Sequence, residues 1–397
     1  MFLTPEEEKL LDGEAGPAMA LAMKVLVKVG EVLGAERLVR ISRAHVSGIS
    51  FKNLGEEGLS FLEELAGKGG KVSVPTTINP AGMDLDKWKE MGVSEAFARG
   101  QLRVINALTR MGADPLLSCA PYEYLDVNLG DLLGWAESNA VLYANSVLGA
   151  RSNREGGPLA LFEAIAGRAP YMGLLTDEGR KPTILVRVRG EIANAAALGY
   201  SIGKLVKKGV PFLVNPPESL RERRELKLFL AAIGAASSIG MVIIEGVTPG
   251  FEYRDVSSSL ERIELDAKDV EDITSRFRGD PEEADAIALG CPHLSIGELK
   301  EILVFLRRAG GRLKRRLLLF TARRAYSSAP SIVHALRDLG AEVYLDTCMV
   351  VADLSGLGID GFVVDSAKAA YYLSAQGYDV TLLSRNEALA LAVRGRL

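Results

Sequence analysis

The sequence predicts an α/β protein with largely parallel sheets, organised as several α/β/α domains. Short apolar runs alternate with stretches of helical periodicity along most of the chain, as strands and helices do in parallel α/β folds. The 397 residues suffice for two or three domains. A hydrophobic content of 48% can fill a substantial core.

The predicted strands are the apolar runs themselves. Each run is short, as buried strands are, and helical stretches lie between most of them. In chain order the predicted strands cover residues 37–42, 71–78, 183–188, 241–245, 316–322, 342–347 and 361–366. One further run, D-A-I-A-L, ends at Gly290 and Pro292, so Cys291 is expected where a strand gives way to a loop.

Two polar segments are the best candidates for domain boundaries. They are the loop L-T-D-E-G-R-K-P at 175–182 and the stretch Y-R-D-V-S-S-S at 253–259. They divide the chain into an N-terminal part at 1–176, a middle α/β part at 177–258 and a C-terminal α/β part at 259–397. The sequence contains no internal repeat and no low-complexity segment.

Charge and hydropathy exclude several classes of function. The 47 basic and 51 acidic residues form no long run of one sign, which argues against a nucleic-acid partner and against a polybasic membrane anchor. No unbroken apolar stretch is long enough to span a membrane, and the first residues lack the order of a signal peptide. We therefore expect a soluble cytoplasmic protein whose partner is a small molecule or another protein.

The chain has three cysteines, Cys119, Cys291 and Cys348, and each follows an apolar run. Ligands of open α/β sheets bind beyond the carboxyl ends of strands, so the three thiols could converge there. Three unrelated buried thiols are the alternative, and a zinc site is less supported because four local ligands are missing. An iron–sulfur cluster on three thiolates would leave one iron open to a substrate hydroxyl, which is dehydratase chemistry.

Several long segments resemble the aconitase X family. They are R-A-H-V-S-G-I-S (43–50), V-P-T-T-I-N-P-A-G-M-D (74–84), S-C-A-P-Y (118–122), W-A-E-S-N-A-V-L-Y-A-N-S-V-L-G-A-R-S-N-R-E-G-G (135–157), G-C-P-H-L-S (290–295) and D-S-A-K-A-A-Y-Y (365–372). The resemblance covers nearly the whole chain. It implies an aconitase-like fold of α/β domains around a cleft with a [4Fe-4S] cluster, held by the three cysteines, with one iron lacking a protein ligand. The chain lacks the paired C-x-x-C ligands of ordinary aconitases, as this family does.

The resemblance also implies a reaction and a partner. The reaction is dehydration of (R)-5-phosphomevalonate to trans-anhydromevalonate 5-phosphate, in a modified mevalonate route to isoprenoids. The implied partner is a separate small subunit, and the proton-abstracting base is expected there because no residue of this chain is a convincing candidate. Two alternatives remain: a cis-3-hydroxy-L-proline dehydratase of the same family, and a non-catalytic α/β protein that binds a small molecule.

Two loops of the matching segments are expected to contact substrate. Gly48, Ile49 and Ser50 would line the loop after the strand 37–42, where glycine permits close approach and successive amides can hold an anion. Asn79 and Pro80 lie beyond the next strand. The resemblance favours substrate contact at both loops, and ordinary turns are the alternative.

Three polar residues elsewhere are further candidates. Glu137 and Ser138 interrupt an apolar stretch, and buried polar groups need partners, so they serve either in the pocket or as packing contacts. Lys368 would lie in the first turn of a helix that Ser366 opens, where amides and an ammonium attract an anion. His45 is a weaker candidate for an acid or a base, since a histidine with a structural role is the alternative.

Overall fold

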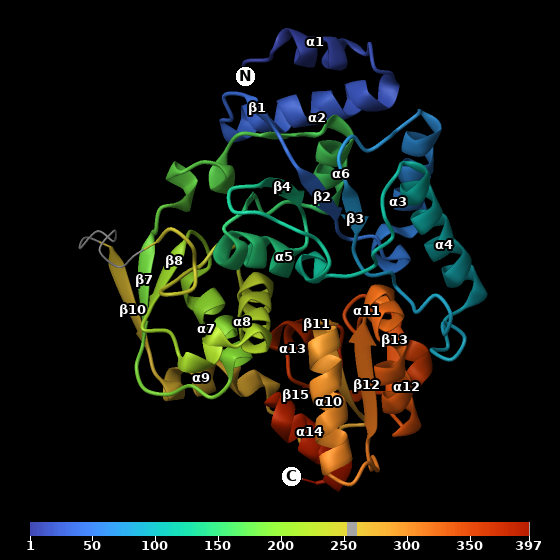
Figure 1. The fold of residues 1–397 in the computed structure, drawn as a ribbon, viewed down its shortest axis with the longest axis vertical. Helices are drawn as coiled ribbons and strands as arrows, with labels where there is room; N and C mark the ends of the chain where they lie inside the picture. Colours follow the sequence, from blue (N-terminus) through green and yellow to red (C-terminus); the bar gives the residue numbers. More distant parts are fainter. Residues whose placement is uncertain (252–259, 397) are drawn as a thin grey trace.

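In the computed structural model of the protein, the described residues form three parallel sheets, each with helices packed against it (Figure 1). The structure describes residues 1–251 and 260–396. In Figure 1 the first sheet lies in the upper part, the second at the left and the third at the lower right. No helix in these two ranges is long and apolar enough to cross a membrane.

The first sheet has four strands in the order β3-β2-β4-β5, all parallel. Its strands are β2 (Arg43–Val46), β3 (Thr76–Ile78), β4 (Leu132–Trp135) and β5 (Arg151–Ser152). The helices of this region are α1 (Pro5–Asp12), α2 (Pro17–Leu33), α3 (Phe51–Gly67), α4 (Glu95–Arg110), α5 (Ser138–Tyr143) and α6 (Gly157–Ala166). An antiparallel pair, β1 (Leu38–Arg40) with β6 (Arg168–Pro170), lies beside this sheet.

A strand lies inside the predicted run at 37–42, but it is not part of the parallel sheet. Its residues form β1, and the strand of the parallel sheet is β2, which starts at Arg43. The chain changes sheets at Ser42, whose N–H and hydroxyl both donate to the carbonyl of Leu132. His45 therefore lies inside a strand rather than after one.

The second sheet has the order β10-β7-β8-β9 and is also parallel. It consists of β7 (Ile184–Val188), β8 (Pro211–Val214), β9 (Ile243–Ile244) and β10 (Glu261–Leu265), with α7 (Ala195–Val206), α8 (Arg223–Ala236) and α9 (Ala267–Thr274). The boundary expected at 258 lies outside the described residues. The strand β10, which follows it, pairs with β7 of this sheet.

The third sheet has five parallel strands in the order β13-β12-β11-β14-β15. The strands are β11 (Ala286–Leu294), β12 (Arg316–Thr321), β13 (Glu342–Leu345), β14 (Gly361–Val364) and β15 (Asp379–Leu382). The helices are α10 (Ile296–Arg308), α11 (Arg323–Ser328), α12 (Pro330–Asp338), α13 (Ala367–Ala375) and α14 (Arg385–Arg394). The predicted α/β fold with largely parallel sheets is thus confirmed.

Helix α8 joins the three regions. It contacts α7 of its own region, α5 of the first and α13 of the third, and Figure 1 shows it at their junction. Every residue from Leu226 to Gly234 is buried, so the helix is covered on all sides. Lys227 is the charged residue within this buried run.

Two carboxyl groups interact at α6, that of the half-buried Glu155 and that of the buried Glu163 within the helix. Burial raises the pKa of Glu155 and of Glu163, and the neighbouring Glu155 carboxyl raises that of Glu163 further. No N–H group of the described residues donates to either carboxyl oxygen of Glu163. The interaction available to the pair is therefore a shared proton.

Replacing Glu163 by glutamine is expected to stabilise the protein at pH 8. The folded protein holds protons on this pair that the unfolded chain releases near pH 4.5, so stability falls as the pH rises from that value through the raised folded-state pKa values. A glutamine needs no proton to donate to Glu155, and the gain at pH 8 should be on the order of 1–3 kcal/mol. Thermal unfolding between pH 4 and pH 9 measures it.

The exposed Glu36 provides a matched control. Glu36→Gln should leave the pH dependence of unfolding unchanged, whereas Glu163→Gln should flatten it. An unaltered slope in Glu163→Gln would show that the carboxyl pair is ionised in the folded protein.

Candidate active site

The candidate site is a cavity of about 430 Å³ that residues of the first and third regions line. Its walls include the loops that follow β2, β3 and β4 of the first sheet, the loop that follows β13 of the third, and helix α13. The strand order reverses between β2 and β4 in one sheet and between β11 and β14 in the other. Ligands of open α/β sheets bind at such reversal points, and here two of them contribute to one cavity.

The three cysteines meet at this cavity. Cys119, Cys291 and Cys348 all line it, and each is at most 5% exposed. Their local settings differ from the three strand ends that were expected. Cys348 follows β13, but Cys291 lies within β11, and Cys119 follows a segment that is not part of a strand.

Cys291 reaches the cavity because β11 leaves the ladder locally. The pairing of β11 with β12 is regular up to Leu289, and its register shifts before Leu294. The residues between these two positions therefore do not pair regularly with β12. Gly290 permits this, since its φ is +114° and a side chain there would clash with the carbonyl oxygen of Phe320. The sequence pattern predicts a strand end at this glycine, but the structure has a bulge within the strand.

Three cysteine thiols beside one lysine at a single cavity are a donor set that is chemically compatible with an iron–sulfur cluster. Burial raises the pKa of all three thiols, to about 12 for Cys119, while the Lys368 ammonium acts on each in the opposite direction. One cation thus lies near all three sulfur atoms, as a set of thiolates requires. In the described part of the chain no group of three or more His, Cys, Asp or Glu side chains is arranged to hold a metal ion as the structure stands.

Glu137 and Lys368 form a buried ion pair on the cavity wall. Lys368 Nζ lies 2.5 Å from Glu137 Oε1, and neither residue is more than 9% exposed. Burial alone would raise the pKa of Glu137, but the Lys368 ammonium and the hydrogen bonds from Lys368, Asn79 and Asn139 together outweigh burial, so the pKa is held at about 2. Burial lowers the pKa of Lys368, and Glu137 reverses this and raises it. Both groups are therefore ionised at neutral pH.

A chain of hydrogen bonds fixes the Glu137 carboxylate. Asn79 Nδ2 donates to Glu137 Oε2 at 2.7 Å, and Asn79 Oδ1 lies 2.9 Å from His45 Nε2. Because the amide oxygen only accepts, His45 carries its proton on Nε2, and Thr77 donates to Nδ1 at 2.8 Å. Burial lowers the pKa of His45 to about 4, so its ring is neutral and orients Asn79.

Most of the predicted binding residues line the cavity. Those that do are Gly48, Asn79, Pro80, Glu137, Ser138 and Lys368. Ile49 and Ser50 are not among the lining residues. Ile49 is buried, and the Ser50 hydroxyl donates to the carbonyl of Val351 at 3.0 Å. The helix start predicted at Lys368 is confirmed, since Ser366 caps α13.

Several cavity residues were not predicted from the sequence. They are Ser47, Lys52, Asn53, Ala136, Val350, Val351, Tyr372 and Gln376. Lys52 stands two residues beyond the predicted Gly-Ile-Ser loop, so the same segment could have indicated it. Gln376 lies beyond the end of α13, and no local pattern marks it.

A larger hollow of about 720 Å³ lies along α10, but fewer of its lining side chains could bind a metal or take part in catalysis. Its lining comes from Gly297, Lys300, Glu301, Val304, Phe305, Arg308 and Ala309, and includes no cysteine. The cavity with the three thiols is therefore the candidate active site.

The chain matches three family models in order. They are described as the aconitase X first domain at 1–178, second domain at 182–275 and third domain at 284–394. A crystal structure described as Thermococcus kodakaraensis aconitase X in its holo-form superposes with a TM-score of 0.90 and 37% identity, over 99% of this chain and 100% of that one.

The matches to two named relatives cover different shares of the length of those relatives. A phosphomevalonate dehydratase large subunit from Methanothermobacter thermautotrophicus is 39% identical over 94% of this chain and 94% of its own length. A cis-3-hydroxy-L-proline dehydratase from Pseudomonas aeruginosa is 34% identical over 92% of this chain but only 65% of its own length. On these matches and on its fold, the chain belongs to the aconitase X family.

Proposed function

We propose that the chain is the large, catalytic subunit of a hydro-lyase that dehydrates (R)-5-phosphomevalonate to trans-anhydromevalonate 5-phosphate. The observation that supports this most strongly is the convergence of three buried thiols and a buried lysine–glutamate pair on one cavity. The end-to-end match to relatives named phosphomevalonate dehydratase large subunit supports the choice of substrate.

Cys119, Cys291 and Cys348 would hold a [4Fe-4S] cluster. Three thiols on one cavity are the ligand set for a cluster in which one iron lacks a protein ligand. When bound, the cluster supplies a Lewis acid for the leaving hydroxyl group. Lys368 and Glu137 remain ionised beside it, so Lys368 would steady negative charge on the substrate while Glu137 fixes the direction of the ammonium.

Lys52 favours a phosphorylated substrate. Its ammonium contacts only neutral acceptors among the described residues, Gln376 Oε1 at 2.8 Å and the carbonyl of Ala352 at 3.5 Å. Lys368 already has a carboxylate partner, so Lys52 is the cation of the described cavity lining that can meet a second anionic group. 5-Phosphomevalonate carries a carboxylate and a phosphate, whereas cis-3-hydroxy-L-proline carries one carboxylate and an ammonium. The charge of the cavity therefore favours the first substrate.

The proton-abstracting base would come from a small subunit. Glu137 is the one carboxylate among the described lining residues, and its pKa of about 2 makes it a weak base. The hydroxyproline dehydratase relative extends well beyond the match, while the relatives named large subunit do not. This difference is what a separate small subunit would produce.

The experiment that tests the function uses the assembled enzyme. The chain is purified anaerobically alone and with its small subunit, reconstituted with iron and sulfide, and assayed with 5-phosphomevalonate and with cis-3-hydroxy-L-proline. We expect a coloured protein in both preparations and turnover of phosphomevalonate only in the complex. Turnover of hydroxyproline alone would refute the proposed substrate, and full activity of the isolated chain would refute the partner.

Replacing Lys52 by methionine is expected to weaken use of the phosphorylated substrate. Loss of one charge-assisted contact should lower kcat/KM roughly ten- to hundredfold, mainly through KM if Lys52 binds the ground and transition states equally. Steady-state kinetics of the complex measure this change. Lys300→Met, on the exposed side of α10, should behave as wild type, and a wild-type KM in Lys52→Met would place the phosphate elsewhere.

A further inference from the structure

His293 contacts the segments of all three cysteines. It lies two residues after Cys291 in β11 and is 1% exposed. Its backbone N–H donates to Cys119 Sγ at 3.3 Å. Its ring Nε2 lies 2.8 Å from the carbonyl oxygen of Thr347, the residue before Cys348. One buried residue thus links three segments that are far apart in the sequence.

The contact with Thr347 fixes the state of the ring. A carbonyl oxygen only accepts, so His293 Nε2 must carry a proton and donate it. The other ring nitrogen, Nδ1, is buried without a hydrogen-bond partner among the described residues. The ring therefore makes one directed contact, and that contact is to the main chain next to Cys348.

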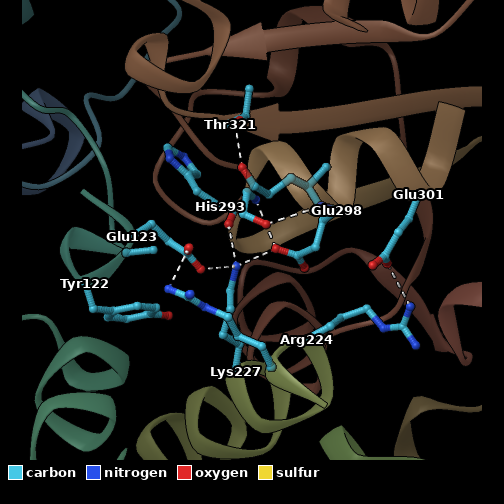
Figure 2. A network of polar contacts seen from close by, with 12 residues as sticks. Tyr122, Glu123, Arg224, Lys227, His293, Glu298, Glu301 and Thr321 are labelled. Atoms are coloured by element: carbon cyan, nitrogen blue, oxygen red, sulfur yellow. Dashed lines mark hydrogen bonds and ion pairs between the residues drawn. The ribbon is translucent and has the colours of Figure 1, made fainter. Parts of the chain in front are cut away.

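The main chain at His293 is itself held from the second region. Lys227 Nζ of α8 donates to the carbonyl oxygen of His293 at 3.0 Å. The same ammonium lies 2.6 Å from Glu298 at the start of α10 and 3.3 Å from Glu123, which follows Cys119 closely in the chain. Figure 2 shows Lys227 with these partners around it. Lys227 is 2% exposed, so this ionic contact is shielded from solvent.

We propose that His293 is a positioning residue that sets the mutual placement of the three thiols. This rests on the proposed function only in that the thiols then hold a cluster. The N–H group orients the Cys119 sulfur, the ring holds the Cys348 segment, and Lys227 fixes the main chain that carries both groups. Groups that hold metal ligands in place in this way contribute to affinity, because the ligands need not be ordered on binding.

Two substitutions separate the donor at Nε2 from the rest of the ring. A glutamine at this position can place its side-chain amide nitrogen where Nε2 lies, whereas the amide nitrogen of an asparagine reaches only the place of Nδ1. His293→Gln should therefore keep the contact with Thr347, and His293→Asn should lose it. The backbone contact with Cys119 remains in both variants.

The first measurement is iron release from the anaerobically reconstituted protein under a chelator. We expect release from His293→Asn to be about tenfold faster or more, and release from His293→Gln to stay near wild type. The exposed His334 supplies the control, and His334→Asn should release iron at the wild-type rate. Equal rates in wild type and His293→Asn would overturn the proposal.

The second measurement needs no iron. In the cluster-free protein the alkylation rate of each cysteine is followed by mass spectrometry. His293→Asn should accelerate alkylation of Cys348 about tenfold or more, with little change at Cys119. Equal acceleration at all three cysteines would indicate general loosening and overturn the proposal.

If wild type binds no cluster, the proposed function fails while this measurement still decides the role of His293. If His293→Asn does not fold, folded His293→Gln decides: slow alkylation supports the donor role and rapid alkylation refutes it.

Discussion

Replacing any one of Cys119, Cys291 and Cys348 by alanine is expected to abolish both the visible absorption of the reconstituted protein and its dehydratase activity. All three thiols line one cavity, and the chain contains no other cysteine to replace a lost ligand. Two remaining thiolates cannot retain a cluster that needs three protein ligands. Iron and sulfide content, visible spectra and turnover of the complex should therefore fall together.

Met349 provides a control beside Cys348. It is a fully buried sulfur-containing residue that does not line the cavity, and leucine fills a similar volume. Met349→Leu should keep the cluster and most of the activity. A fully coloured and active Cys291→Ala protein would contradict the assignment of that residue as a ligand.

The second large effect is expected at the Glu137–Lys368 pair. Lys368→Met leaves the Glu137 carboxylate buried without its cation, which typically costs about 3–5 kcal/mol of stability. Activity should fall at least about a hundredfold, because the substrate loses a charge-assisted contact and the wall of the cavity carries an unpaired charge. Thermal unfolding and steady-state kinetics of the complex measure the two consequences separately.

The double variant Glu137→Gln with Lys368→Met distinguishes structure from chemistry. Removing both charges avoids an unpaired buried ion, so most of the lost stability should return. Activity should not return, since no ammonium then faces the substrate. Lys368→Arg should restore activity poorly, because the planar guanidinium places its donors differently. Recovered activity in the double variant would show that the pair serves only the fold.

The strands that the sequence predicted well are the continuous apolar runs. The structure has strands at Ile184–Val188, Arg316–Thr321 and Gly361–Val364, each inside a predicted run. Parallel strands covered on both faces need apolar residues throughout, so the pattern marks them directly. The apolar run at 37–42 marks a strand but not the sheet to which that strand belongs. It pairs with the distant strand β6 instead of joining the parallel sheet.

In the candidate site, too, the sequence predicted the features that depend on local signals and not those that depend on distant residues. The residue types and the family motifs indicated the three cysteines, Asn79, and the start of the helix at Lys368, because these depend on local signals. They did not indicate that Lys368 would pair with Glu137, which lies 231 positions earlier, since any loop of the right length could have carried the anion.

The sequence by itself determined the fold class, the family and the set of thiols, because periodicity and long motifs are properties of neighbouring residues. Only the tertiary structure decided that Ile49 and Ser50 do not line the cavity, that Lys52 faces it without a carboxylate partner among the described residues, and that His293 contacts all three cysteine segments. These contacts depend on how separate regions pack against one another around α8. That packing is set by buried contacts between residues far apart in the chain, which no local pattern encodes.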